Sequence, residues 1–170
     1  QIHDQTEARS LPNKAHAVFN AIEAMPKPVI AAVRGYALGG GCELALACHY
    51  RVGDHRTRLG QPEINLFLPP GFGGTQRLPR ILAAGHKAGL REALLMLLSG
   101  RQVDGTHAAE IGLLDRLAQA SEDVFGLAHA LARQAALTGE GPAVAAQHRR
   151  QELSAKWQEP GRWPAKVLQD

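Results

Sequence analysis

The stretch from Val29 to Cys48 constrains the fold of this chain more than any other part of the sequence. A short unbroken apolar run, VIAAV, begins at Val29 after a proline and ends before Gly35. A run of this length, bounded by turn residues, is typical of a strand that is buried on both faces. A glycine-rich turn to Gly41 follows, and Cys42–Cys48 then supplies a compact helix of small and apolar residues. The order of strand, glycine turn and helix predicts an α/β fold.

The regions on either side of this stretch have helical patterns. Before it, apolar residues recur at three- and four-residue intervals from Ser10 to Met25, with Pro12 in the first turn of the expected helix. After it, a second short strand is expected at Tyr50–Val52. Ser121, followed by two acids, is the expected start of a later helix. Beyond the second glycine-rich segment, glycines and prolines separate helical stretches near residues 75–82, 90–98, 105–111, 121–137 and 142–157.

The bulk composition excludes several classes of protein. The chain has 170 residues, 21% of them charged, and a net charge of +3, which tolerates an anionic ligand but does not demand nucleic acid. Cys42 and Cys48 have neither the spacing of paired zinc ligands nor that of a disulfide framework, so a reducing compartment is expected. The eight histidines are scattered, and no metal is expected. The residues after Gln1 show no signal-peptide pattern, and no apolar window reaches the ~18 residues of a membrane span. We therefore expect a cytoplasmic protein without membrane partners.

Two carboxylates and a glycine cluster carry the chemistry that the sequence offers. Gly39–Gly41 either make a tight turn for close packing or let a helix N-terminus approach an oxyanion. Glu43 interrupts an otherwise apolar helix, where a carboxylate must be paired, hydrogen-bonded or used. Glu63, fixed behind Pro62, is a second candidate. If both carboxylates converge on one site, burial and mutual repulsion separate their pKa values and allow acid and base roles. A purely structural role stays open for both from spacing alone.

Five ordered blocks of residues carry a more specific pattern. These are KPVIAAVRGYALGGGCELA at 27–45, GQPEI at 60–64, PGFGGTQRLPR at 70–80, LSGR at 98–101 and AAEIGLL at 108–114. With these blocks, the region from Met25 to Leu117 resembles the enoyl-CoA hydratase/isomerase family, also called the crotonase family. The resemblance implies a crotonase-like ββα core in residues 1–117, lacking its N-terminal strands. It also implies a helical C-terminal region in residues 118–170 that builds trimers.

The resemblance implies roles for individual residues. The N–H of Gly40 becomes one oxyanion-hole donor to the thioester carbonyl of an acyl-CoA substrate, whose coenzyme A is part of that substrate and not a separate cofactor. Glu43 and Glu63 hold and activate the water that adds across the α,β double bond, and the N–H of Gly71 helps to place that water. The resemblance further implies a homotrimer or a hexamer.

The sequence also departs from the family pattern. The family carries a second oxyanion donor and much of the CoA-binding surface on a segment before the first helix, and this chain begins after that point. We therefore expect the chain as written to be a poor catalyst. The bulky Phe67 stands where a glycine is more usual. The alternatives are a Δ3-Δ2-enoyl-CoA isomerase, another crotonase-type lyase or hydrolase, or a non-catalytic RNA-binding relative, although nucleic acid is disfavoured by the few aromatic residues.

Overall fold

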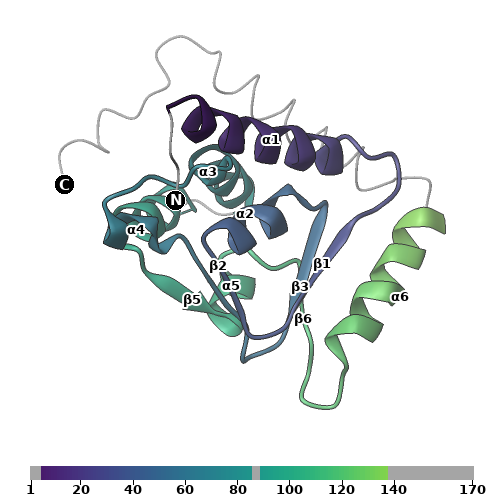
Figure 1. The fold of residues 1–170 in the computed structure, drawn as a ribbon. Helices are drawn as coiled ribbons and strands as arrows, with labels where there is room; N and C mark the ends of the chain where they lie inside the picture. Colours follow the sequence, from purple (N-terminus) through teal and green to yellow (C-terminus); the bar gives the residue numbers. More distant parts are fainter. Residues whose placement is uncertain (1–4, 86–88, 138–170) are drawn as a thin grey trace, which may run out of the picture.

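The computed structural model describes residues 5–85 and 89–137 (Figure 1). These residues form helices interleaved with short strands, so the expected α/β fold is confirmed. The helix expected near residues 142–157 lies outside the described part. The elements in chain order are α1 (Gln5–Glu23), β1 (Ile30–Val33), β2 (Tyr36–Leu38), α2 (Gly40–Ala47), β3 (Tyr50–Gly53), β4 (Arg58–Gly60), the 3₁₀ helix η1 (Pro62–Leu66), α3 (Gly74–Gly85), α4 (Gly89–Ser99), β5 (Gln102–Asp104), α5 (Gly105–Glu110), β6 (Arg116–Leu117) and α6 (Val124–Leu137).

The strands form two small sheets, and the chain crosses from the first sheet to the second at two bends. The first has the order β1-β3-β6 with parallel pairing, and the second has the order β2-β4-β5, with β4 parallel to β2 and antiparallel to β5. The chain passes from β1 to β2 and from β3 to β4 at the same end of the molecule, at the bottom of Figure 1. The hydroxyl of Thr57 donates to the Val33 carbonyl at 2.9 Å and ties the two bends together.

The main core lies between these sheets and the helices α2, α3, α4 and α5. Its largest fully buried apolar side chains are Leu59, Leu78, Leu82, Met96 and Leu113. A smaller cluster, containing Val52, Ala118, Val124 and Ala128, joins α6 to the first sheet. In Figure 1, α6 stands beside β1 and β3, apart from the layer of α1 to α4. Because Cys42, Ala45 and Leu46 of α2 belong to the main core, this core supports the glycine-rich turn at the start of that helix.

Two helix starts differ from the sequence prediction. Helix α1 begins at Gln5, so Pro12 lies inside it. Proline is favoured in the first turn of a helix, which is why Pro12 suggested a start near Ser10, but as the eighth residue of α1 it leaves the carbonyl of Ala8 without the usual N–H donor. Helix α6 begins at Val124, and Asp123 caps it by accepting a hydrogen bond from the N–H of Gly126 at 3.0 Å. Asp123, and not Ser121, provides the cap because its carboxylate is the acceptor next to the first free N–H groups.

The burial of β1 also differs from the prediction. Val33 is buried, Ile30 and Ala31 are half-buried, and Ala32 is exposed, so the strand is not covered on both faces. Side chains alternate between the faces of a strand. One face packs on the main core, while on the other face α6 covers Ile30 and leaves Ala32 open. Strand β2 is a further difference, because the sequence assigns Tyr36–Leu38 to the glycine turn.

Candidate active site

Glu43 lies in the first turn of α2 and is 1% exposed. Its Oε1 atom accepts hydrogen bonds from the backbone N–H groups of Phe72 and Gly74, each at 2.8 Å. The loop before α3 therefore folds over the N-terminus of α2 and fixes one oxygen of this carboxylate. A buried charge is tolerable only with such partners.

Gly74 owes its identity to this close packing. A Cβ at this position would lie 3.1 Å from Cγ of Glu43 and 2.7 Å from a terminal atom of the Gln61 amide. Both of these side chains are fully buried. The absence of a side chain at Gly74 thus lets its N–H reach Glu43.

Glu63 is held on η1, directly after Pro62, and is half-buried. With the Gln61 amide oriented so that its nitrogen faces Glu63, this nitrogen donates to both carboxylate oxygens at 3.2 Å. Burial raises the pKa of Glu63 above its ordinary value of 4.5, and the nearby charge of Glu43 acts in the same direction, against a lowering by its own backbone N–H. The protonated form of Glu63 is therefore favoured more than in a free glutamate.

The N-terminus of α2 lies beside both carboxylates. Gly40 is the first residue of α2, where an N–H has no carbonyl acceptor within the helix. The preceding Gly39 adopts φ 55°, a conformation that favours glycine, and a Cβ there would lie 3.0 Å from Oε1 of Glu63. The structure thus brings Gly40, Glu43 and Glu63 together from two separate segments of the chain.

Gly71 lies in the same loop as the donors to Glu43, but its own recorded contact is different. It is exposed, and its carbonyl oxygen lies 2.9 Å from Nε2 of His16 on α1. The N–H groups that bind Glu43 belong to Phe72 and Gly74 instead. The role of Gly71 in placing a water stays a prediction.

Sequence reasoning missed three contributors to this site. Gln61 is fully buried beside Glu63, Phe72 supplies an N–H to Glu43, and Arg77 donates to the Phe72 carbonyl at 2.9 Å. Gln61 and Arg77 stand in the blocks that carry the family pattern. Their position in these blocks was the available signal for their roles.

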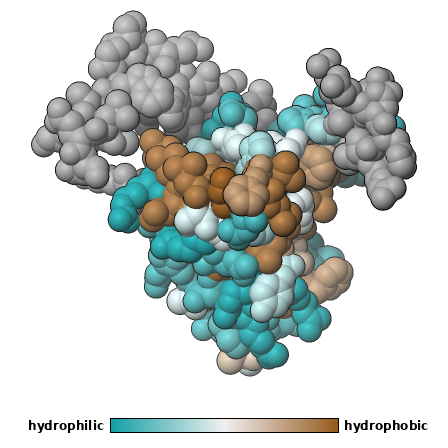
Figure 2. Space-filling model, turned by 60° about the vertical axis from the view of Figure 1, so that its left-hand side comes forward, coloured by the Kyte–Doolittle hydropathy of each residue, from teal (hydrophilic) through white to brown (hydrophobic). Residues whose placement is uncertain are grey.

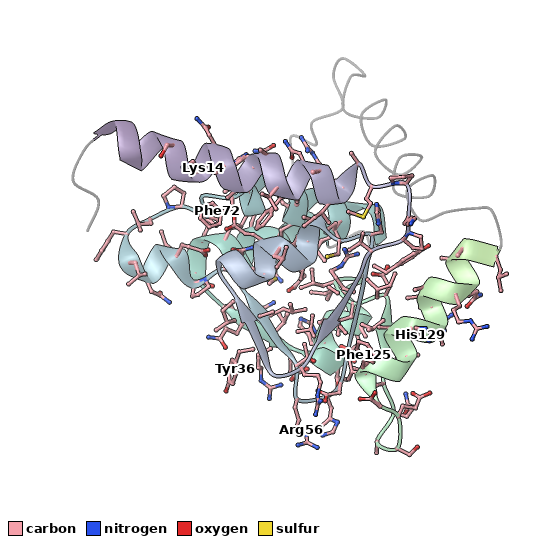
Figure 3. The ribbon with its side chains drawn as sticks, turned by 45° about the vertical axis from the view of Figure 1, so that its right-hand side comes forward. Lys14, Tyr36, Arg56, Phe72, Phe125 and His129 are labelled. Atoms are coloured by element: carbon pink, nitrogen blue, oxygen red, sulfur yellow. The ribbon has the colours of Figure 1, made fainter. Side chains whose placement is uncertain are left out.

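Other reactive groups of the described residues offer less. Cys42 is fully buried, and burial raises the pKa of its thiol to about 12. Within residues 5–85 and 89–137, no cluster of three or more His, Cys, Asp or Glu side chains is placed to hold a metal ion, and no helix is long and apolar enough to cross a membrane. Figure 3 shows Phe72 close beneath α1, whereas Tyr36 and Arg56 mark the opposite end of the molecule.

Comparison with known proteins gives consistent findings. A sequence model of the family described as enoyl-CoA hydratase/isomerase matches residues 2–160. A crotonyl-CoA hydratase of Syntrophomonas wolfei is 46% identical over 116 residues, which are 68% of this chain and 42% of that protein. A fatty acid oxidation complex subunit alpha of a Shewanella species is 49% identical over 111 residues, which are 64% of this chain and 15% of that protein.

The solved structures agree with the sequence relatives. An enoyl-CoA hydratase from Bacillus anthracis superimposes with a TM-score of 0.63 at 34% identity, covering 82% of this chain and 49% of that one. The chain spans less than half the length of each of these three proteins.

Proposed function

Because the chain belongs to the enoyl-CoA hydratase/isomerase, or crotonase, family, we propose that it carries the two-carboxylate part of a site that adds water across the α,β double bond of an acyl-CoA thioester. One observation carries this proposal. Glu43 and Glu63 lie beside the same helix N-terminus but in different environments, one fixed by two N–H donors and the other with a raised pKa. Two carboxylates with such different environments are suited to separate acid and base roles.

The two roles follow from these environments. Glu43, with one oxygen fixed by Phe72 and Gly74, orients the water and accepts one of its protons as the oxygen attacks the β-carbon. Glu63, whose pKa is raised, delivers a proton to the α-carbon. One molecule of water is thereby added, the thioester carbonyl has enolate character during the step, and the proton on Glu43 returns to Glu63 before the next turnover. In this proposal the N–H of Gly40, at the positive end of the α2 dipole, stabilises the thioester oxygen.

The substrate class follows from the family, and coenzyme A enters as part of the substrate. The names of the relatives support an acyl-CoA of fatty acid oxidation. The cytoplasm as compartment rests on the two cysteines, which are both free thiols. The boundary between the core and a C-terminal region at residue 117 is part of the same proposal.

A homotrimer or hexamer is supported by an exposed apolar surface. Figure 2, which brings the side with α4 forward, shows apolar side chains gathered on one face. Exposed apolar patches of this kind mark interaction sites more often than free surface. The exposed apolar residues of η1, the loop after it and α4 are Ile64, Leu66, Phe67, Leu68, Leu94 and Leu98. Light scattering at micromolar concentration tests the proposed assembly, and a monomer at that concentration contradicts the proposal.

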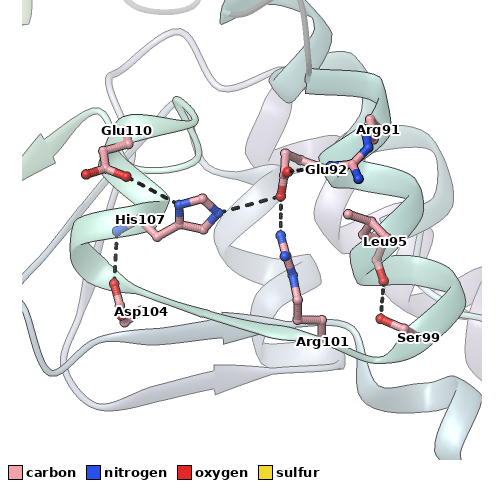
Figure 4. A network of polar contacts seen from close by, with 8 residues as sticks. All are labelled: Arg91, Glu92, Leu95, Ser99, Arg101, Asp104, His107 and Glu110. Atoms are coloured by element: carbon pink, nitrogen blue, oxygen red, sulfur yellow. Dashed lines mark hydrogen bonds and ion pairs between the residues drawn. The ribbon is translucent and has the colours of Figure 1, made fainter.

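The reaction is tested with crotonyl-CoA as the probe. Loss of the conjugated thioester absorbance, with a product heavier by one water in mass spectrometry, supports hydration. Glu63→Gln is expected to lower the rate by at least ~10²-fold, the usual effect of removing a positioned acid or base. Glu110→Gln is the matched control and leaves the rate unchanged, because Glu110 is an exposed carboxylate of α5 that contacts His107 of the same helix (Figure 4). A near-normal rate in Glu63→Gln removes Glu63 from the mechanism, and a rearranged product of unchanged mass favours an isomerase.

A further inference from the structure

We propose that Arg77 is a positioning residue, which holds the Phe72–Gly74 loop against α1 and thereby fixes the carboxylate of Glu43. Arg77 lies in the first turn of α3 and is only 7% exposed. Its effect on turnover rests on the proposed function, but its effect on the geometry of Glu43 does not.

The guanidinium of Arg77 joins three elements. Its Nη1 donates to the Phe72 carbonyl at 2.9 Å, while Nη2 donates to Oδ1 of Asn20 at 2.8 Å and to Oε2 of Glu23 at 3.0 Å. Asn20 and Glu23 lie on α1, so the fork of the guanidinium spans the space between this helix and the loop. The planar fork of an arginine can hold two such partners in fixed directions.

The contact is transmitted through Phe72 to Glu43. The carbonyl of Phe72 accepts from Arg77, and the N–H of the same residue donates to Oε1 of Glu43 at 2.8 Å. The N–H of Gly74, two residues further on, donates to the same oxygen at 2.8 Å. A shift of the loop away from Arg77 therefore changes both bonds that fix the carboxylate.

Helix α1 supports the loop with a single face. His16, Phe19, Asn20 and Glu23 have the i, i+3, i+4 and i+7 spacing of one helix side. Nε2 of His16 lies 2.9 Å from the Gly71 carbonyl oxygen. The Phe19 ring meets the Phe72 ring edge to face with centroids 6.1 Å apart, and the Arg77 guanidinium lies 5.9 Å from the Phe19 centroid. Figure 3 shows Phe72 on the side of the loop that faces α1.

Arg77→Lys is the informative variant, because lysine keeps the charge and loses the fork. The chain offers a matched control in Arg51→Lys. Arg51 is equally buried, with its side chain 4% exposed against 8% for Arg77, and it also pairs with one carboxylate and donates to backbone carbonyls. Asp115, the carboxylate partner of Arg51, lies directly before β6 of the first sheet, whereas the partners of Arg77 lie on α1 and the loop. Both variants are therefore expected to lose stability, so a loss of stability by itself does not support the proposal.

The first measurement is amide hydrogen exchange by NMR, which needs no turnover. In Arg77→Lys we expect the N–H groups of Phe72 and Gly74 to exchange at least roughly 10-fold faster, after correction for global stability, because local opening of the loop becomes easier. In Arg51→Lys these two amides keep their wild-type rates. Unchanged exchange of both amides in Arg77→Lys overturns the proposal. If Arg77→Lys does not fold, Asn20→Ala removes one contact from an exposed position, and it must speed up the same amides or the proposal falls.

The second measurement is hydration of crotonyl-CoA. We expect kcat of Arg77→Lys to fall by roughly 10- to 10²-fold with KM within about threefold of wild type, because a misplaced carboxylate affects the chemical step and not substrate binding. Arg51→Lys keeps the wild-type kcat. A wild-type kcat in Arg77→Lys, together with faster amide exchange, shows that the loop is held by Arg77 without consequence for catalysis and overturns the catalytic part. If the wild-type chain hydrates nothing, the proposed function fails while the exchange data still decide the role of Arg77 in the geometry.

Discussion

Replacing Gly74 with alanine tests whether the site around Glu43 is as tightly packed as the structure indicates. The new Cβ would lie 2.7 Å from the Gln61 amide and 3.1 Å from Cγ of Glu43, and both neighbours are fully buried. Forcing an extra methyl group into packed surroundings costs about 1–3 kcal/mol. Alanine recovers at most ~0.5–1 kcal/mol because it favours a helix over glycine.

The net effect is a loss of about 0–2.5 kcal/mol in the free energy of unfolding, centred near ~1 kcal/mol. For a chain of this size, ~1 kcal/mol corresponds to a fall of roughly 2–4 °C in Tm, measured by thermal unfolding followed by circular dichroism. The matched control is Gly126→Ala in α6, where a Cβ would meet its nearest atom at 3.7 Å, an ordinary contact. Gly126→Ala is expected to raise the stability by about 0.5–1 kcal/mol. If Gly74→Ala is as stable as this control, the neighbours of Gly74 have room to move and Glu43 is not rigidly held.

Three further predictions concern the buried ionisable groups. Because the pKa of Glu63 is raised in the folded protein, its contribution to stability is fully present below pH 4.5 and is lost as the pH rises through the folded value. Urea unfolding across this window is therefore expected to show wild type losing stability relative to Glu63→Gln as pH rises, and parallel profiles contradict the shift. Asp115→Ala leaves the buried Arg51 guanidinium without its carboxylate, and a loss of about 3–5 kcal/mol in urea unfolding is expected, so a loss below 1 kcal/mol argues against the ion pair. The thiol of Cys42, fully buried with a pKa of about 12, should resist a thiol-modifying disulfide reagent until the protein unfolds, and rapid modification in the native state refutes this burial.

The local elements of this protein were largely determined by short-range sequence patterns. The apolar run ending at Val33, the glycine turn and the helix carrying Glu43 follow from residues within a few positions of one another. The start of α2 is fixed because only glycine readily adopts the φ of 55° at Gly39. Strand β2 was missed because a three-residue strand leaves almost no periodic signal. The start of α1 was placed too late because Ser10 and Pro12 together are typical of a helix start.

The tertiary structure alone decided which groups surround the carboxylates. The N–H donors of Glu43 come from Phe72 and Gly74, 29 and 31 residues further along the chain, and Arg77 reaches Asn20 across 57 residues. Periodicity and propensity describe neighbours in sequence, whereas these contacts depend on how α1, α2 and the loop before α3 pack together. The sequence therefore supplied the carboxylates and the glycines that let the backbone approach them. Packing of elements far apart in the chain set the direction of each carboxylate and the burial that raises the pKa of Glu63.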